Sequence, residues 1–225
     1  MEPSNNGAKT TPESTPQRPV RPHPDSLLKP KHQWIPRSWP FWRNLILYFC
    51  LFSWVGHWME IGYCTIMDSL FHIVDPNSGV WQSPLFPFPV YGCAVVVIAL
   101  VMEPFRGHLI HRWAIRGKSK AVACWDFYWA SVLLSMCMEL AQGFIQNQPD
   151  ENGVYPLWDN SQLPGNILGQ AWIVNDLLLG ALVSLMTWVV YPLCERTLGK
   201  VPDKVLNAAL PVVLILFVAC LVLFQ

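Results

Sequence analysis

Charged residues are scarce in this sequence. Only 13% of its 225 residues are Asp, Glu, Lys or Arg, whereas 52% are hydrophobic, and soluble domains carry roughly 25% charged residues. Positive charge is missing altogether from two stretches, 44–105 and 121–195. Each stretch is long enough for two membrane spans and the loop that joins them. The composition therefore excludes an ordinary soluble domain and predicts an integral membrane protein in contact with a lipid bilayer.

Several motifs of known chemistry are also missing. The seven cysteines form no C-x-x-C pair, so we interpret them as buried thiols rather than a disulfide or zinc framework. The sequence has no P-loop, dinucleotide fingerprint or nucleophile motif, and we predict no cofactor. The formal net charge of zero gives no reason to expect nucleic acid as a partner.

The positive charges that are present occur in three blocks. All fifteen Lys and Arg lie in Lys9–Arg43, Arg106–Lys120 and Arg196–Lys204. Basic residues concentrate on the cytoplasmic side of membrane proteins. We therefore predict that the three blocks and the N-terminus are cytoplasmic, and that each stretch without Lys or Arg leaves this side as a helical hairpin and returns to it. Nothing in the sequence indicates the organelle.

The sequence predicts two regions. Residues 1–38 are rich in Pro, Ser, Thr and Asn, which predicts a disordered cytoplasmic tail. Residues 39–225 form the predicted transmembrane domain, an all-α polytopic bundle of five spans. The expected spans are about 43–65, 89–104, 121–144, 171–193 and 205–224. Glu103-Pro104 is interpreted as the end of the second span, followed by a basic loop.

Three acids inside the predicted spans share one depth. At 1.5 Å per residue, Glu60 lies about 25 Å along its helix from Arg43, and Glu139 about 28 Å from Lys120. Asp176 lies roughly 8 Å inside the other end of the fourth span. No Lys or Arg lies at this depth, and His57 is the nearby base. Ionisable residues in membrane spans commonly face a bundle interior and mark functional sites.

Helical spacing places these acids on polar stripes. The stripes are Ser53, His57, Glu60 and Cys64; Ser131, Ser135, Glu139 and Gln142; and Asp176, Gly180, Ser184 and Thr187. The functional hypothesis is an outward-facing acidic pocket that binds a proton, a cation or a cationic solute, with His57 as a proton partner. The structural alternative is that the carboxyl groups only join helices through hydrogen bonds.

Several short motifs resemble a known family. They are Gly56–Glu60, Pro89–Gly92, Glu139 with Gly143, Leu157–Asp159 and Asn166–Gly169. Over about Leu51 to Pro192 the chain resembles the transmembrane protein 229 family, grouped with the bacterial "putative ABC-transporter type IV" (CmpB-like) proteins. The family pattern contains the sequence W-D-Y-S. This chain has Trp158-Asp159-Asn160-Ser161 there, so Asn160 replaces the Tyr. The resemblance implies a small multi-pass membrane protein without an assigned activity, and it adds Tyr91, Trp158 and Asp159 as residues at the entrance of the site.

A faint internal symmetry accompanies these motifs. Glu60 and Glu139 are each followed about twenty residues later by a Trp, Trp81 or Trp158, as a parallel duplication of hairpins would produce. Three functions stay open. The first is a transport or solute-binding component, the second an integral-membrane enzyme acting on a lipid-like substrate with the same acids, and the third an accessory or scaffold protein with a partner membrane protein. The sequence does not indicate which metal ion, if any, the predicted site would bind.

Overall fold

The computed structural model describes residues 38–224 apart from 73, 75, 77, 152, 154, 156 and 157. Within this part of the chain, five helical stretches are long and apolar enough to cross a membrane, which confirms the predicted fold class. They are Trp39–Leu70, Pro89–Ile115, Lys120–Gln146, Ile173–Leu198 and Asp203–Leu223. The predicted tail, except Ser38, and Leu157 of the family motif lie outside the described residues.

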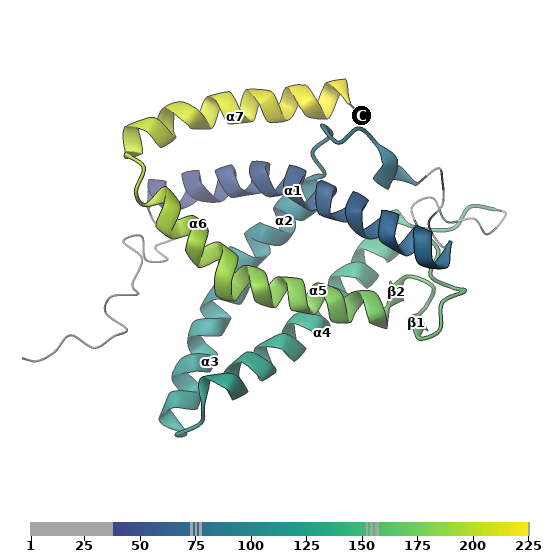
Figure 1. Ribbon diagram of the computed structural model, residues 1–225, viewed down its shortest axis with the longest axis horizontal. Coiled ribbons are helices and arrows are strands. Elements are labelled where there is room, and N and C mark those ends of the chain that lie inside the picture. The colour runs from purple at the N-terminus through teal and green to yellow at the C-terminus, as the bar shows by residue number, and fades with distance from the viewer. Residues whose placement is uncertain are drawn as a thin grey trace, which may run out of the picture.

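Long helices alternate with short connections along the chain (Figure 1). The elements are α1 (Trp39–Phe71), η2 (Gly79–Trp81), α2 (Pro89–Val97), η3 (Ile98–Met102), α3 (Glu103–Ile115), α4 (Lys120–Gln146), β1 (Asn166–Ile167), β2 (Ala171–Trp172), α5 (Ile173–Leu185), η4 (Met186–Val190), α6 (Tyr191–Leu198) and α7 (Asp203–Leu223). The segment η2 is a 3-10 turn, whereas η3 and η4 are π-helical segments within the second and fourth spans.

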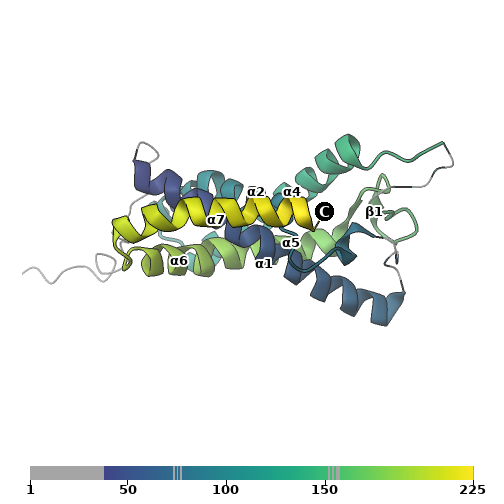
Figure 2. The same ribbon diagram turned by 90° about the horizontal axis from the view of Figure 1, so that it is seen from above.

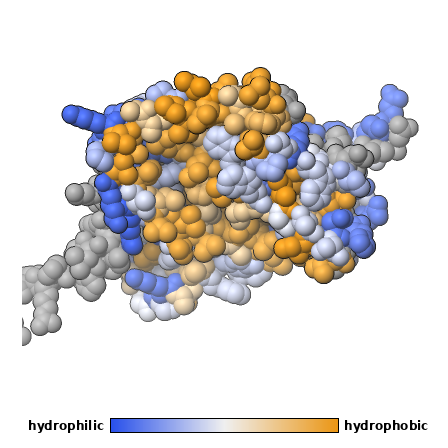
Figure 3. All heavy atoms as spheres, turned by 45° about the horizontal axis from the view of Figure 1, so that its top comes forward, coloured by the Kyte–Doolittle hydropathy of each residue, from blue (hydrophilic) through white to orange (hydrophobic). Residues whose placement is uncertain are grey.

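The surface has the polarity expected of a membrane protein. Figure 3 shows apolar side chains across the middle of the molecule and hydrophilic ones toward its two ends. Large apolar side chains such as Leu133, Ile215 and Val222 are more than half exposed. Lipid tails accept such side chains without the free-energy cost of their exposure to water.

The two ends of the bundle differ in charge. The α3–α4 and α6–α7 connections both lie on the left side of Figure 1, the first at the bottom and the second near the top, and both carry basic residues. We call this the basic end. The β1–β2 hairpin and the three predicted acids lie toward the opposite end, which we call the acid end.

The second span is longer than the sequence predicts. We expected it to end at Glu103-Pro104, but the helix continues as α3 to Ile115, so most of the predicted basic loop is helical. Pro104 lies in the first turn of α3, directly after the π segment η3. A proline ring clashes with the carbonyl four residues earlier, and here that residue, Leu100, lies within the wider π turn. The helix can therefore pass the proline without stopping.

The first four spans form two hairpins with the same layout. In each, a long helix is paired with a returning helix, α1 with α2 and α4 with α5. Gly180, η4 and Pro192 follow one another at the same spacing as Gly92, η3 and Pro104. A Cβ on Gly92 would overlap Ser53 and the backbone of Phe49 in α1. This repetition supports the internal duplication suspected from the sequence.

The equivalent glycine of the second hairpin marks an equivalent crossing. A Cβ on Gly180 would lie 2.9 Å from the backbone nitrogen of Val132 in α4. Glu60 lies about two helical turns beyond Ser53, and Glu139 about two turns beyond Val132. Each crossing thus sets the position of one acid relative to the returning helix.

A short hairpin precedes α5. Strands β1 and β2 pair antiparallel, with Ile167 opposite Ala171. Between them, Leu168 (φ 55°) and Gly169 (φ 69°) both adopt positive φ, and the N–H of Gln170 donates to the carbonyl of Ile167 at 3.1 Å. Two consecutive positive φ angles are typical of a type I′ hairpin turn. Because the strand includes Ala171 and Trp172, the fourth span begins at Ile173 rather than at the expected 171.

Helix α7 packs along α1. At the basic end, Nη1 of Arg43 in α1 is 2.9 Å from the Asp203 carboxylate and 3.0 Å from Oδ1 of Asn207. Figure 2 shows α7 lying over the middle of the bundle, while the C-terminal part of α1 extends away from it. The last span therefore adds to the outside of the two hairpins through α1.

Candidate functional site

Two of the three predicted acids meet in the structure. Glu139 of α4 and Asp176 of α5 lie within hydrogen-bonding reach of each other, so a proton on either carboxyl can join them. Asp176 is completely buried, and Glu139 is half-buried. The Nδ2 of Asn175 donates to Oε1 of Glu139 at 3.1 Å. We call Glu139 and Asp176 the acid pair.

Hydrogen-bond donors are scarce around the acid pair. Within the described part of the chain, Oε2 of Glu139 and both carboxyl oxygens of Asp176 are buried without a hydrogen-bond donor. Two carboxylates in contact repel each other in a low dielectric, and an unpaired buried charge costs on the order of several kcal/mol. A proton shared between the carboxyl groups, or a cation bound by their oxygens, removes both penalties.

The surrounding elements hold the pair in register. Gly180 packs against Val132, and Gly143 of α4 packs against the side chain of Gln170, so α5 and the turn before it approach α4 closely. Asp176 lies in the first turn of α5, where the partial positive charge of the helix N-terminus stabilises an acid. The β1–β2 hairpin therefore sets the depth at which Asp176 meets Glu139.

The third predicted acid, Glu60, interacts within its own hairpin. Its carboxyl group faces the hydroxyl of Tyr91 in α2 and lies near His57. Tyr63, on the same helix as Glu60, lies close enough to Glu139 to interact electrostatically with it. The structure thus gives Glu60 a phenol donor in the first hairpin and gives Glu139 an acid partner in the second. The sequence had predicted one pocket shared by all three acids.

His57 contacts a loop rather than solvent. It is completely buried, with Nδ1 2.8 Å from the carbonyl oxygen of Phe86 and Nε2 3.1 Å from that of Val80. The indoles of Trp54 and Trp58 donate to two further carbonyls of the same loop at 2.8 and 2.7 Å. Three side chains of α1 therefore hold the loop before α2. The role of His57 as a proton partner of Glu60 stays a prediction.

Trp158 and Asp159 lie in the loop between α4 and β1. The indole of Trp158 donates to the carbonyl of Gln170 at 2.8 Å, and Nδ2 of Asn147 donates to the carbonyl of Trp158 at 2.7 Å. Asp159 is exposed, and its carboxylate accepts from the backbone N–H of Ser161 at 2.8 Å, closing a turn. These contacts fasten the loop to the second hairpin near the acid pair.

Sequence reasoning missed the amides that organise this loop. Asn147 and Gln170 are almost completely buried. Nδ2 of Asn147 donates to Oε1 of Gln170 at 3.0 Å, and Nε2 of Gln170 donates to the carbonyl of Asn147 at 2.9 Å. Asn175 was also missed, although it directly precedes Asp176. Gln170 directly follows the motif residue Gly169 and Asn175 directly precedes Asp176, whereas Asn147 lies four residues after Gly143.

The donor set around the acids bears on metal binding. Among the described residues, no group of three or more His, Cys, Asp or Glu is arranged to hold a metal ion. The acid pair supplies two carboxyl groups and an adjacent amide, whereas Ca²⁺ takes six to eight oxygen ligands. The arrangement therefore fits a proton or a small, weakly coordinated cation better than a protein-caged divalent ion.

Together, five apolar helices and two hairpins with buried acids define a multi-pass α-helical membrane protein. The family described as "Putative ABC-transporter type IV" matches residues 47–224, and the chain belongs to that family. This confirms the broader of the two family resemblances and places the protein among transport-related membrane proteins. No curated protein and no solved structure matches the chain.

Proposed function

We propose that this protein is a transport component that binds a proton or a small cation at the acid pair. The observation that carries the proposal is the contact of Glu139 with the completely buried Asp176, where three of the four carboxyl oxygens have no donor in the described part of the chain. A purely structural acid would normally be satisfied by hydrogen bonds. The transport-related family is consistent with this function.

The predicted orientation makes the acid end the outward-facing one. Basic residues at the α3–α4 and α6–α7 connections support a cytoplasmic location for the basic end. The acid pair then forms an outward-facing pocket, with Glu60 and Tyr91 beside it in the first hairpin. Trp158 and Asp159 form its entrance, because their loop is fastened next to β2 and α5. The motifs around these residues also favour the narrower assignment to the transmembrane protein 229 family.

The melting temperature of the purified protein in detergent tests the acid pair. It is measured between about pH 5 and about pH 9, and with LiCl, NaCl, KCl, MgCl2 or CaCl2, for the wild type, Glu139→Gln and Asp176→Asn. If the folded pair holds a proton that the unfolded carboxyl groups have already lost, unfolding releases that proton. A rise in pH then favours unfolding, and the wild type melts at a lower temperature. A cation that binds only the folded state raises the melting temperature. At a hundredfold excess of the cation over its Kd, the free energy of unfolding increases by about 2.7 kcal/mol.

Glu151→Gln is the matched control, because Glu151 is an exposed acid in the loop after α4. This variant should retain the wild-type response to pH and salt. Asp176→Asn should lose that response while remaining folded, since Asn can donate to Glu139. Identical pH and salt profiles for the wild type and Asp176→Asn would contradict the proposal and leave the acids as structural contacts between α4 and α5.

A further inference from the structure

A surface of unbalanced positive charge lies at the α3–α4 connection. We call residues 108–120, which include the end of α3 and the first residue of α4, the basic tip. It contains four Lys or Arg, two His and no acid. Arg112 and Arg116 are one helical turn apart, where like charges destabilise a helix. Four cationic side chains of the tip are exposed and form no ion pair within the described part of the chain: Arg112, Arg116, Lys118 and Lys120.

The end of α3 fixes two of these charges over one aromatic ring. Gly117 adopts a positive φ of 63°, and its N–H donates to the carbonyl of Ala114 at 3.1 Å. The N–H of Lys118 donates to the carbonyl of Trp113 at 2.9 Å. These two hydrogen bonds form a Schellman motif, which turns the chain back over the last helical turn. Cζ of Arg116 and Nζ of Lys118 therefore lie 5.2 and 4.5 Å from the centre of the Trp113 ring.

The packing of α3 against α4 supports the basic tip. Leu109 of α3 is buried together with Ala123 and Phe127 of α4 in one hydrophobic cluster. Trp113 packs against the same cluster. The ring that carries the two cations is therefore attached to both helices, and the position of the cations is part of the fold.

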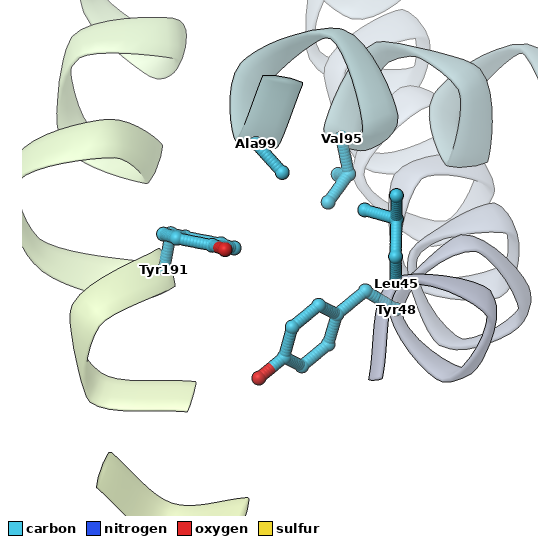
Figure 4. Packing of buried hydrophobic residues seen from close by; sticks show 5 residues of the cluster. All are labelled: Leu45, Tyr48, Val95, Ala99 and Tyr191. Atoms are coloured by element: carbon cyan, nitrogen blue, oxygen red, sulfur yellow. The ribbon is translucent and has the colours of Figure 1, made fainter. Parts of the chain in front are cut away.

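The α6–α7 connection carries mixed charge instead. Helix α6 packs into the bundle through a buried apolar cluster that it shares with α1 and the second span (Figure 4). Asp203, the first residue of α7, forms an ion pair with Arg43. The exposed Lys200 and Lys204 lie close to this acid in the sequence. The α6–α7 connection therefore provides a matched control for the basic tip.

Exposed apolar side chains indicate that the basic tip lies at the membrane surface. Ile115, within the tip, is 73% exposed. Trp125 and Trp129 on α4 are 61% and 45% exposed, with ring centres 5.7 Å apart. Trp is enriched where a membrane meets water, and Trp125 lies about 8 Å along α4 from Lys120. The charges of the tip then lie at the level of the lipid phosphates.

Two other occupants fit this surface less well. Residues 1–37 contain six Lys or Arg and three Asp or Glu, so their net charge has the same sign as that of the tip. An acidic protein segment would meet the cations but supplies no apolar group for the exposed Ile115. A phospholipid supplies both a phosphate and an apolar chain.

We propose that the basic tip binds a phospholipid with an anionic headgroup, which Arg116 and Lys118 hold in the leaflet at the basic end. A guanidinium group binds two phosphate oxygens at once, and an ammonium group adds a point charge. The cytoplasmic leaflet, on the predicted side of the tip, contains the anionic lipids. This site does not depend on the function proposed for the acid pair.

Native mass spectrometry tests the site. The full chain is equilibrated in mixed micelles with equal amounts of phosphatidylserine and phosphatidylcholine that have the same acyl chains. The wild type should retain more phosphatidylserine than phosphatidylcholine. Arg116→Gln combined with Lys118→Gln should lower the ratio of the two bound lipids at least fivefold, because each cation near an anionic surface strengthens binding several-fold. Both side chains are exposed, so this variant should fold.

Two further variants separate the site from net charge. Lys200→Gln combined with Lys204→Gln removes the same charge from the basic end and should keep the wild-type ratio. Gly117→Val retains every charge, but a β-branched residue disfavours positive φ, so the cations should leave the Trp113 ring. Its ratio should lie between those of the wild type and the Arg116→Gln, Lys118→Gln variant.

The outcomes decide between a lipid site and its alternatives. Equal binding of the two lipids by the wild type would overturn the proposal. Equal losses in the two double variants, or a wild-type ratio in Gly117→Val, would reduce the site to a general attraction of basic residues to anionic lipid and would also overturn it. Fluorescent polyglutamate is titrated separately in neutral detergent. Polyglutamate binding that needs Arg116 and Lys118, without any preference for phosphatidylserine, would assign the tip to an acidic protein segment.

Discussion

The two hairpins share a scaffold but place different groups beside their acids. Each has a glycine at the helix crossing, then a π segment and a proline on the returning helix. In the first hairpin, Glu60 faces the hydroxyl of Tyr91, whereas in the second, Glu139 faces the carboxyl of Asp176. Each acid has one donor, Tyr91 for Glu60 and Asn175 for Glu139, and one buried oxygen without a donor among the described residues, but only Glu139 also faces a second acid. The same scaffold therefore places a phenol beside the acid of one hairpin and a second acid beside that of the other, and the proposed proton or cation concerns the second.

The loops of the two hairpins are also held by different groups. Side chains of α1, including the completely buried His57, hold the first loop through its backbone carbonyls. The second loop is held by the reciprocal amides of Asn147 and Gln170. The first arrangement ties the loop to the helix that carries Glu60. The second ties β2 and the start of α5 to the helix that carries Glu139, which keeps the acid pair together.

The largest effect should come from the shared crossings. Gly92→Ala and Gly180→Ala should each lower the free energy of unfolding by about 3 kcal/mol, because the new methyl group meets helix backbone. Gly62→Ala is the control, since nothing lies within 4 Å of a Cβ there, and it should be neutral or stabilising by up to about 1 kcal/mol. Thermal melting and SDS titration measure the difference. Equal stability of Gly180→Ala and Gly62→Ala would show that the crossing tolerates a side chain.

A smaller loss should follow from breaking the second loop. Asn147→Ala removes three hydrogen bonds and leaves buried groups of Gln170 and Trp158 without partners, so we expect a loss of about 2 kcal/mol. Gln148→Ala, at the exposed neighbouring amide, should change stability by less than about 0.5 kcal/mol. Proteolysis of the loop and thermal melting report the two effects. A loss in Asn147→Ala no larger than in Gln148→Ala would argue against the amides as the support of the loop.

The acids themselves should respond in opposite ways. At alkaline pH, Asp176→Asn should stabilise the protein by about 1 kcal/mol, because the amide donates to Glu139 and ends the repulsion. Glu60→Gln should change the dependence of the melting temperature on pH less than Asp176→Asn does, since Glu60 faces the Tyr91 hydroxyl rather than a second acid. The comparison between the hairpins fails if Glu60→Gln flattens the pH profile and Asp176→Asn does not.

The smallest effect should be at Tyr91. Tyr91→Phe keeps the ring that packs against Gly56 but removes the hydroxyl that faces Glu60, so we expect a loss of about 0.5–1 kcal/mol. Pairing this change with Glu60→Gln in a double-mutant cycle isolates the contact. Additive effects would show that the hydroxyl and the carboxyl do not interact, and would remove the phenol donor assigned to Glu60.

The sequence by itself determined the class of the protein and predicted the depth of its acids. The class follows from the low charge, the five apolar stretches and the three basic blocks. These are properties of short segments, so the hydropathy and charge of the sequence are enough to recognise them. Helical rise is constant, so counting residues from the basic blocks was enough to place Glu60 and Glu139 near one end of the bundle. The family motifs needed no structure either, because they are local.

The tertiary structure alone decided which polar groups meet. Counting along a helix does not say which way it is rotated in the bundle, and the Gly92 and Gly180 crossings, which set that rotation, depend on packing between segments distant in sequence. For this reason the sequence did not show that Glu139 would meet Asp176 while Glu60 would meet the hydroxyl of Tyr91; the pocket shared by all three acids stays a prediction. Glu103-Pro104 was wrongly interpreted as a helix end, because the π turn that accommodates the proline arises only in the folded helix. Glu103 therefore forms an ion pair with Arg106 within α3 instead of ending the second span.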